Sequence, residues 1–150
     1  MDLTSFEKVL DFAIQNEIEA RDLYQSLAHR SQTPAMKAVF EQFSKEEDGH
    51  RIKLEGIKGG ASPMPLDTNV QDLKIGDFLV DVEPEPDMNY QEALIFAMKK
   101  EKEAFKLYTT LADFIDNPML KETFHALAQE EAKHKLRFEI EYDDEVMTDN

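Results

Sequence analysis

Apolar residues recur along two long stretches of the chain at alternating intervals of three and four positions. This spacing is typical of amphipathic helices that lie nearly parallel to their neighbours in a bundle. A short polar turn interrupts each stretch once, so each stretch contains two helices. We therefore expect two helical hairpins, at about residues 4–58 and 89–147, and an all-α four-helix bundle.

Local signals predict where these helices begin and end. Thr4–Glu7 and Asn89–Glu92 have the residue types of capping boxes and predict the starts of the first and third helices. Thr33–Pro34 predicts the start of the second helix, because threonine is a good N-cap and proline is favoured at the first helical position. Gly59–Gly60 is expected to end that helix, and Asp116–Pro118 forms the turn before the fourth.

The connection between the hairpins, residues 59–88, is long and contains several prolines. Antiparallel neighbours need only a tight turn, whereas a connection of this length can travel along the whole bundle. We therefore expect a crossover, with at most a short helix at Leu73–Val80. The alternative is a hinge that exchanges hairpins between two subunits.

The two hairpins repeat one pattern at a constant offset, because every matched pair, like Glu17 and Glu101, is 84 positions apart. The matched positions are Glu17 with Glu101, Ala20 with Ala104, Tyr24 with Tyr108, Pro34 with Pro118, Phe40 with Phe124, Glu47 with Glu131, and His50 with His134.

Six polar residues occupy positions of the apolar stripes, one glutamate on each of the first and third helices and an E-x-x-H pair on each of the others. They are Glu17, Glu47, His50, Glu101, Glu131 and His134. The midpoint between the two glutamates of each hairpin, position 32 or 116, falls in a predicted turn. The glutamates of a hairpin therefore lie at one level, and all six side chains converge if the hairpins pack in matched register.

A buried group of four carboxylates needs a neutralising partner. The alternative to a buried site is that these glutamates are ordinary charged residues on a solvated surface. That interpretation suits the glutamates outside the stripes, which are Glu19, Glu46, Glu103 and Glu130. It does not suit the stripe glutamates, because burying unpaired charges is costly and no lysine or arginine occupies a stripe position. Four carboxylates and two imidazoles therefore predict a site for two divalent ions, with iron or manganese favoured and zinc an alternative occupant.

Composition narrows the function classes further. A chain of 150 residues is expected to form one domain, residues 1–150, with a sizeable core. The net charge of −15 disfavours nucleic acid and anionic membranes as partners, and no apolar run approaches the length of a membrane span. The acidic stretch MDLTSFEKVLDF does not resemble a secretory signal, and we expect a cytoplasmic location. Without cysteine there are no disulfides, iron–sulfur centres or cysteine nucleophiles.

The roles of two tyrosines and two further histidines are less clearly indicated by the sequence than those of the six stripe residues. Tyr24 and Tyr108 each follow a stripe glutamate by two helical turns, so each is either a core side chain or a hydrogen-bond donor that steadies a ligand carboxylate. His29 and His125 have no partner in the repeat, and we interpret them as surface residues or residues at the periphery of the site.

This ligand pattern resembles that of the ferritin-like di-iron carboxylate proteins, and of rubrerythrins in particular. The motif E-x-x-A-x-x-x-Y occurs at Glu17–Tyr24 and at Glu101–Tyr108, each time followed by an E-x-x-H pair. The resemblance implies a ferritin-like bundle whose six stripe residues bind two irons, with one glutamate of each E-x-x-H pair bridging them. It also implies reduction of hydrogen peroxide or dioxygen, with electrons from a separate rubredoxin-type carrier.

Two departures from the rubrerythrin pattern bear on the reaction. The cysteine-rich rubredoxin domain of rubrerythrins proper is absent from this sequence. Peroxide-reducing members also carry an extra glutamate one turn after the third-helix ligand, where this chain has Ala104. The neighbouring Glu103 cannot substitute for it, because adjacent residues point about 100° apart around a helix.

Three functions are therefore compared. The first is a redox enzyme, expected as a homodimer that is either simple or hairpin-swapped. The second is a ferroxidase or iron-binding protein without peroxide turnover. The third is a domain in which the metals are structural.

Overall fold

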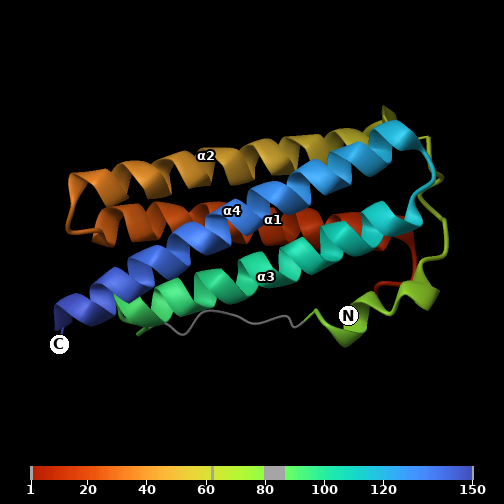
Figure 1. The fold of residues 1–150 in the computed structure, drawn as a ribbon. Coiled ribbons are helices and arrows are strands. Elements are labelled where there is room, and N and C mark those ends of the chain that lie inside the picture. The colour runs from red at the N-terminus through yellow and green to blue at the C-terminus, as the bar shows by residue number, and fades with distance from the viewer. Residues whose placement is uncertain (1, 62, 80–86, 150) are drawn as a thin grey trace.

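The computed structural model describes residues 2–61, 63–79 and 87–149. Within these residues the chain forms four long helices: α1 (Phe6–Arg30), α2 (Pro34–Gly56), α3 (Tyr90–Phe114) and α4 (Pro118–Asp149). α1 packs along α2 and α3 along α4, so the two predicted hairpins are present. Their turns lie at opposite ends of the bundle (Figure 1). The prediction of an all-α four-helix bundle is confirmed.

Side chains cap the starts of the helices. α1 begins one residue later than predicted, because Ser5 rather than Thr4 accepts a hydrogen bond, from the backbone N–H of Lys8 at 3.3 Å. Thr33 caps α2 as expected. The capping box at Asn89–Glu92 is complete, because each side chain accepts a hydrogen bond from the other residue's backbone N–H.

The end of α2 and the crossover differ in detail from the prediction. α2 is followed by one π-helical turn (η1, Ile57–Ala61), in which Gly60 adopts a φ of +110° that only glycine accepts readily. Instead of the predicted helix at Leu73–Val80 there are two 3₁₀ turns, η2 (Gln71–Leu73) and η3 (Ile75–Asp77). They are separated by Lys74 in the left-handed conformation, which no α-helix accommodates, and Val80 lies outside the described residues.

The crossover also covers the start of α1. The backbone N–H groups of Phe6 and Glu7 donate to the carbonyl oxygens of Thr68 and Leu66, each at 2.9 Å. These bonds satisfy donors at the first turn of α1, which have no partner within the helix. α2 ends and α3 begins at opposite ends of the bundle, as expected for two hairpins joined by a crossover (Figure 1).

The core is divided into two apolar clusters. One includes Leu10, Leu54, Leu111 and Phe124, and the other includes Phe40, Leu94 and Phe138. On every helix the change from one cluster to the other occurs at the polar stripe residues, so these residues form a layer in the middle of the bundle. Among the described residues no helix combines the length and apolar character that crossing a membrane requires.

Candidate metal centre

The middle layer contains all six stripe residues, and all six are buried. Glu17 comes from α1, Glu47 and His50 from α2, Glu101 from α3, and Glu131 and His134 from α4. None is more than 5% exposed. The convergence expected from the repeat is therefore present in the structure.

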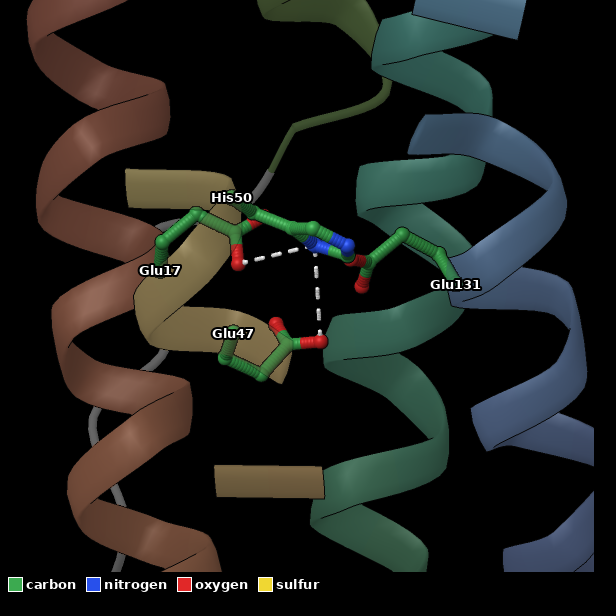
Figure 2. A group of neighbouring side chains, drawn as sticks. All are labelled: Glu17, Glu47, His50 and Glu131. Carbon is green, nitrogen blue, oxygen red and sulfur yellow. Dashed lines mark ion pairs between the residues drawn. The ribbon is translucent and has the colours of Figure 1, made fainter. Parts of the chain in front are cut away.

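The side chains form two groups of four that could each hold a metal ion. In each group, one ligand atom per residue lies within 4.8 Å of the others. The first group is Glu17, Glu47, His50 and Glu131, whose side chains point toward one another in Figure 2. The second is Glu47, Glu101, Glu131 and His134. Glu47 and Glu131 belong to both groups, so their carboxylates would bridge the two positions if both were occupied.

Each histidine lies nearest the bridging glutamate of the other hairpin. His50 Nδ1 is 2.8 Å from Glu131 Oε1, but 3.7 Å from Glu47 Oε1 on its own helix. In the same way His134 Nδ1 is 2.8 Å from Glu47 Oε1. The E-x-x-H spacing therefore places the glutamate and the histidine of one helix in the same layer. The closest contacts of each histidine Nδ1 are nevertheless made between α2 and α4.

One nitrogen or oxygen atom on each of the six residues is buried without a hydrogen bond. These atoms are Glu17 Oε2, Glu47 Oε1, His50 Nδ1, Glu101 Oε2, Glu131 Oε1 and His134 Nδ1. Several of them approach one another closely, yet none has the geometry of a hydrogen bond. Buried polar atoms normally find a partner. Atoms that converge without hydrogen bonds suit a ligand placed between them, and a set of carboxylates and imidazoles suits a divalent transition-metal ion.

The two tyrosines bond across the hairpins. Tyr108 Oη donates to Glu17 Oε1 at 2.6 Å, and Tyr24 Oη donates to Glu101 Oε1. Each tyrosine thus holds one oxygen of a glutamate from the other hairpin, and the second oxygen of that glutamate is the one without a partner. Such a bond steadies a ligand carboxylate and leaves its free oxygen directed at the centre.

Burial and mutual repulsion dominate the electrostatics of the layer. Burial, followed by the neighbouring carboxylates, raises the pKa of both Glu47 and Glu131 well above the usual value. Burial also raises the pKa of Glu17, but interactions led by that with His50 outweigh it, so its pKa is lowered. Burial and the adjacent carboxylates raise the pKa of Tyr24 and Tyr108, so both phenols keep the proton that they donate.

One contact at the centre was missed by the sequence reasoning, which assigned Glu46 to the solvated surface. Its Oε2 accepts a hydrogen bond from His134 Nε2 at 2.8 Å, and its side chain is only 32% exposed. The nearby Phe43 ring stacks on the His134 imidazole, with centroids 4.0 Å apart. The sequence did contain a signal for this contact, because a second glutamate directly precedes the candidate ligand in both E-x-x-H pairs, Glu46 before Glu47 and Glu130 before Glu131.

Other candidate residues lie away from the centre. His29 and His125 are exposed, and Glu103 belongs to neither group of four. Ala104 is buried in an apolar cluster with Leu107 and Tyr108, so no carboxylate occupies its position.

One lysine next to a ligand candidate is itself buried, Lys100 beside Glu101 on α3. Its ammonium group donates to Asn16 Oδ1 and Glu19 Oε2, at 3.0 and 3.1 Å. Its charge is therefore paired on the flank of the bundle, away from the carboxylate layer.

Comparison with solved structures gives the same fold. A protein of Thermotoga maritima, described as a putative ferritin-like diiron-carboxylate protein, matches with a TM-score of 0.80 at 20% identity, over 94% of this chain and 96% of that one. A hypothetical protein of Pyrococcus furiosus matches with a TM-score of 0.72 at 25% identity, over 93% and 89% of the two chains. The first likeness shows the fold, and the second protein's description names no activity.

Comparison at the level of sequence families agrees. No match is found among the curated proteins. The family model for rubrerythrin matches residues 8–68 and 92–148, which include both hairpins and all six buried ligand candidates. The chain therefore belongs to the rubrerythrin family.

Proposed function

We propose that the chain binds two iron ions in the middle layer and transfers electrons from them to hydrogen peroxide or dioxygen. The observation that supports this most directly is the set of six buried ligand atoms without a hydrogen bond, one from each candidate residue. Two divalent ions would balance the four carboxylates, whose burial and mutual repulsion the tyrosine hydrogen bonds and the two histidines offset only in part.

The residues have distinct parts in this proposal. Glu17 and Glu101 would each hold one ion with the oxygen that the tyrosine leaves free. Glu47 and Glu131, which belong to both groups of four, would each serve both ions, and one histidine would complete each ligand set. When bound, two ferrous ions supply the two electrons that reduction of a peroxide requires. The bundle keeps bulk water out of the layer, since all six ligand candidates are at least 95% buried.

Electrons must return to the centre from outside the chain, because the sequence contains no cysteine for a second iron centre. We propose a separate rubredoxin-type protein as the donor and a homodimer as the working form.

Rapid mixing of the di-ferrous protein with peroxide, and separately with dioxygen, tests the proposed reaction. We expect at least one of the two to oxidise the bound iron much faster than it oxidises free ferrous ion at the same concentration. Glu131→Ala removes a bridging ligand and should lower the bound iron from two ions per chain to one. Glu122→Ala, an exposed change on α4, should keep two. Oxidation no faster than that of free iron with both oxidants would refute the proposal.

Ala104 supports a second candidate function, iron oxidation and handling without peroxide turnover. Ala104 stands where peroxide-reducing relatives have the extra glutamate, and it is buried in an apolar cluster. The same mixing experiment distinguishes the two, because an iron-handling protein should react with dioxygen, take up further ferrous ion afterwards and show no sustained peroxide consumption with an electron donor.

A further inference from the structure

The two histidines, equivalent by the repeat, have different surroundings. The Nε2–H group of His134 donates to Glu46, whereas His50 Nε2 has no hydrogen-bond partner among residues 2–61, 63–79 and 87–149. The residue that corresponds to Glu46 is Glu130, which the repeat would pair with His50. Its carboxylate instead lies within 4.8 Å of the ligand atoms of Glu46 and His134. Both off-stripe carboxylates are therefore close to the same histidine.

The stacking partners differ as well. Phe43 stacks on the His134 ring, and the position that corresponds to Phe43 in the second hairpin is Leu127, which packs in an apolar cluster. His50 consequently receives no equivalent aromatic contact from that position. Both histidines are buried, and the Phe43 ring adds a contact on one face of the His134 imidazole.

The hydrogen bond with Glu46 determines which nitrogen of His134 can bind a metal. With the proton on Nε2, the lone pair remains on Nδ1, the atom that lies 2.8 Å from Glu47 Oε1. A carboxylate that accepts this N–H bond fixes the ring orientation and makes the imidazole a stronger ligand, and loss of such a partner typically weakens metal binding 10- to 100-fold. Among the residues that the structure describes, none gives His50 either advantage.

We propose that Glu46 is a positioning residue that makes the metal position at His134 the tighter of the two, so that the centre fills in a fixed order. The ion beside His134 binds first, and the ion beside His50 is the exchangeable one. This inference rests on the proposed two-metal centre, but it concerns the order of filling and not the reaction.

Titration of the metal-free protein with cobalt(II) tests the proposal, because the visible absorption of cobalt reports its ligands. We expect two resolved steps of one equivalent each in the wild type. Glu46→Ala should weaken the first step 10- to 100-fold and alter its spectrum, so that the two steps merge. Glu46→Gln keeps an acceptor for the N–H group and should restore most of the affinity of the first step. Glu130→Ala, which removes the same charge nearby, should change it less than threefold.

Two further variants assign the steps. His134→Ala should abolish the tight step and His50→Ala the weak one. Equal affinities for the two equivalents in the wild type, or equal effects of Glu46→Ala and Glu130→Ala, would overturn the inference and leave the proposed function standing. No cobalt binding by the wild type would instead overturn the metal centre itself.

Discussion

At the scale of single residues, the tyrosine hydroxyls connect the two halves of the centre. Tyr108 reaches from α3 to Glu17 on α1, and Tyr24 reaches from α1 to Glu101 on α3. Both hydroxyls are fully buried, so neither can exchange its carboxylate partner for water. A charged partner makes such hydrogen bonds stronger than average, at about 1.5–3 kcal/mol.

Removing one of these hydroxyls should therefore be costly. We expect Tyr108→Phe to lower the free energy of unfolding of the metal-free protein by about 1–3 kcal/mol, because one oxygen of a buried carboxylate loses its donor. Urea denaturation measures the change. Tyr142→Phe, at a half-buried tyrosine on α4 for which no hydrogen bond is described, should change it by less than about 0.5 kcal/mol. Equal effects of the two substitutions would contradict the structural role of the Tyr108 bond.

Residue identities in the centre were predictable because helix periodicity determines which side chains face inward. Glu131 faces the layer and Glu130 does not, and the same count separates Glu47 from Glu46. The cross-hairpin partners were not predictable in this way. Whether Tyr24 bonds Glu101 or its own helix's glutamate depends on the offset between hairpins, and the bond from His134 to Glu46 depends on the distance between α2 and α4.

At the scale of elements, the starts of the helices depend on single side chains. Asn89 and Glu92 satisfy backbone donors at the beginning of α3, the helix that carries Glu101 and Tyr108. By contrast the start of α1 is stabilised partly by the crossover, through the bonds to Leu66 and Thr68. α3 consequently depends more than α1 on its own capping side chains.

We therefore expect Asn89→Ala to lower the free energy of unfolding by about 1 kcal/mol, since alanine offers no acceptor to the first turn of α3. Metal stoichiometry should stay at that of the wild type, because Glu101 lies three turns away. Glu41→Ala, an exposed change within α2, serves as the control and should be nearly neutral. A loss of bound metal in Asn89→Ala would show that the cap also positions the centre.

The long helices could be predicted closely because each combines a periodic stripe with a local start signal. The crossover could not, because it has no periodic pattern, and its 3₁₀ turns follow from burial of Val70, Ile75 and Leu79 at the end of the bundle. Ser5 replaced Thr4 as the cap of α1 for a similar reason. The chain before Phe6 is held by the crossover, and Val70 N–H donates to the Thr4 carbonyl oxygen.

At the scale of the whole molecule, the carboxylate layer opposes folding when no metal is bound. Three groups in the layer have a pKa above the usual value in the folded protein. Burial and the neighbouring carboxylates raise the pKa of Glu47 and Glu131. Burial lowers the pKa of His134, but the interactions with Glu101 and Glu46 outweigh it and raise that pKa. Above about pH 4.5 the folded chain therefore holds more protons than the unfolded chain, and its stability falls as the pH rises.

We accordingly expect the metal-free protein to be less stable at about pH 8 than at about pH 5, measured by urea denaturation in the presence of a chelator. The metal-loaded protein should show the reverse trend, because metal and protons compete for the same atoms. The double variant Glu47→Gln, Glu131→Gln should flatten the dependence of the metal-free form. If that variant keeps the full dependence, the net charge of the chain and not the buried layer is responsible.

The crossed arrangement of the ligands has a consequence for how such a chain can arise. Each group of four combines three residues of one hairpin with a bridging glutamate of the other. A half-length peptide with a single hairpin would supply only three of these four residues to any ion, and a second copy of itself would have to supply the bridging glutamate. An ancestor of half this length would thus have been an obligate pair, and joining its two copies by the crossover would have made the partner permanent.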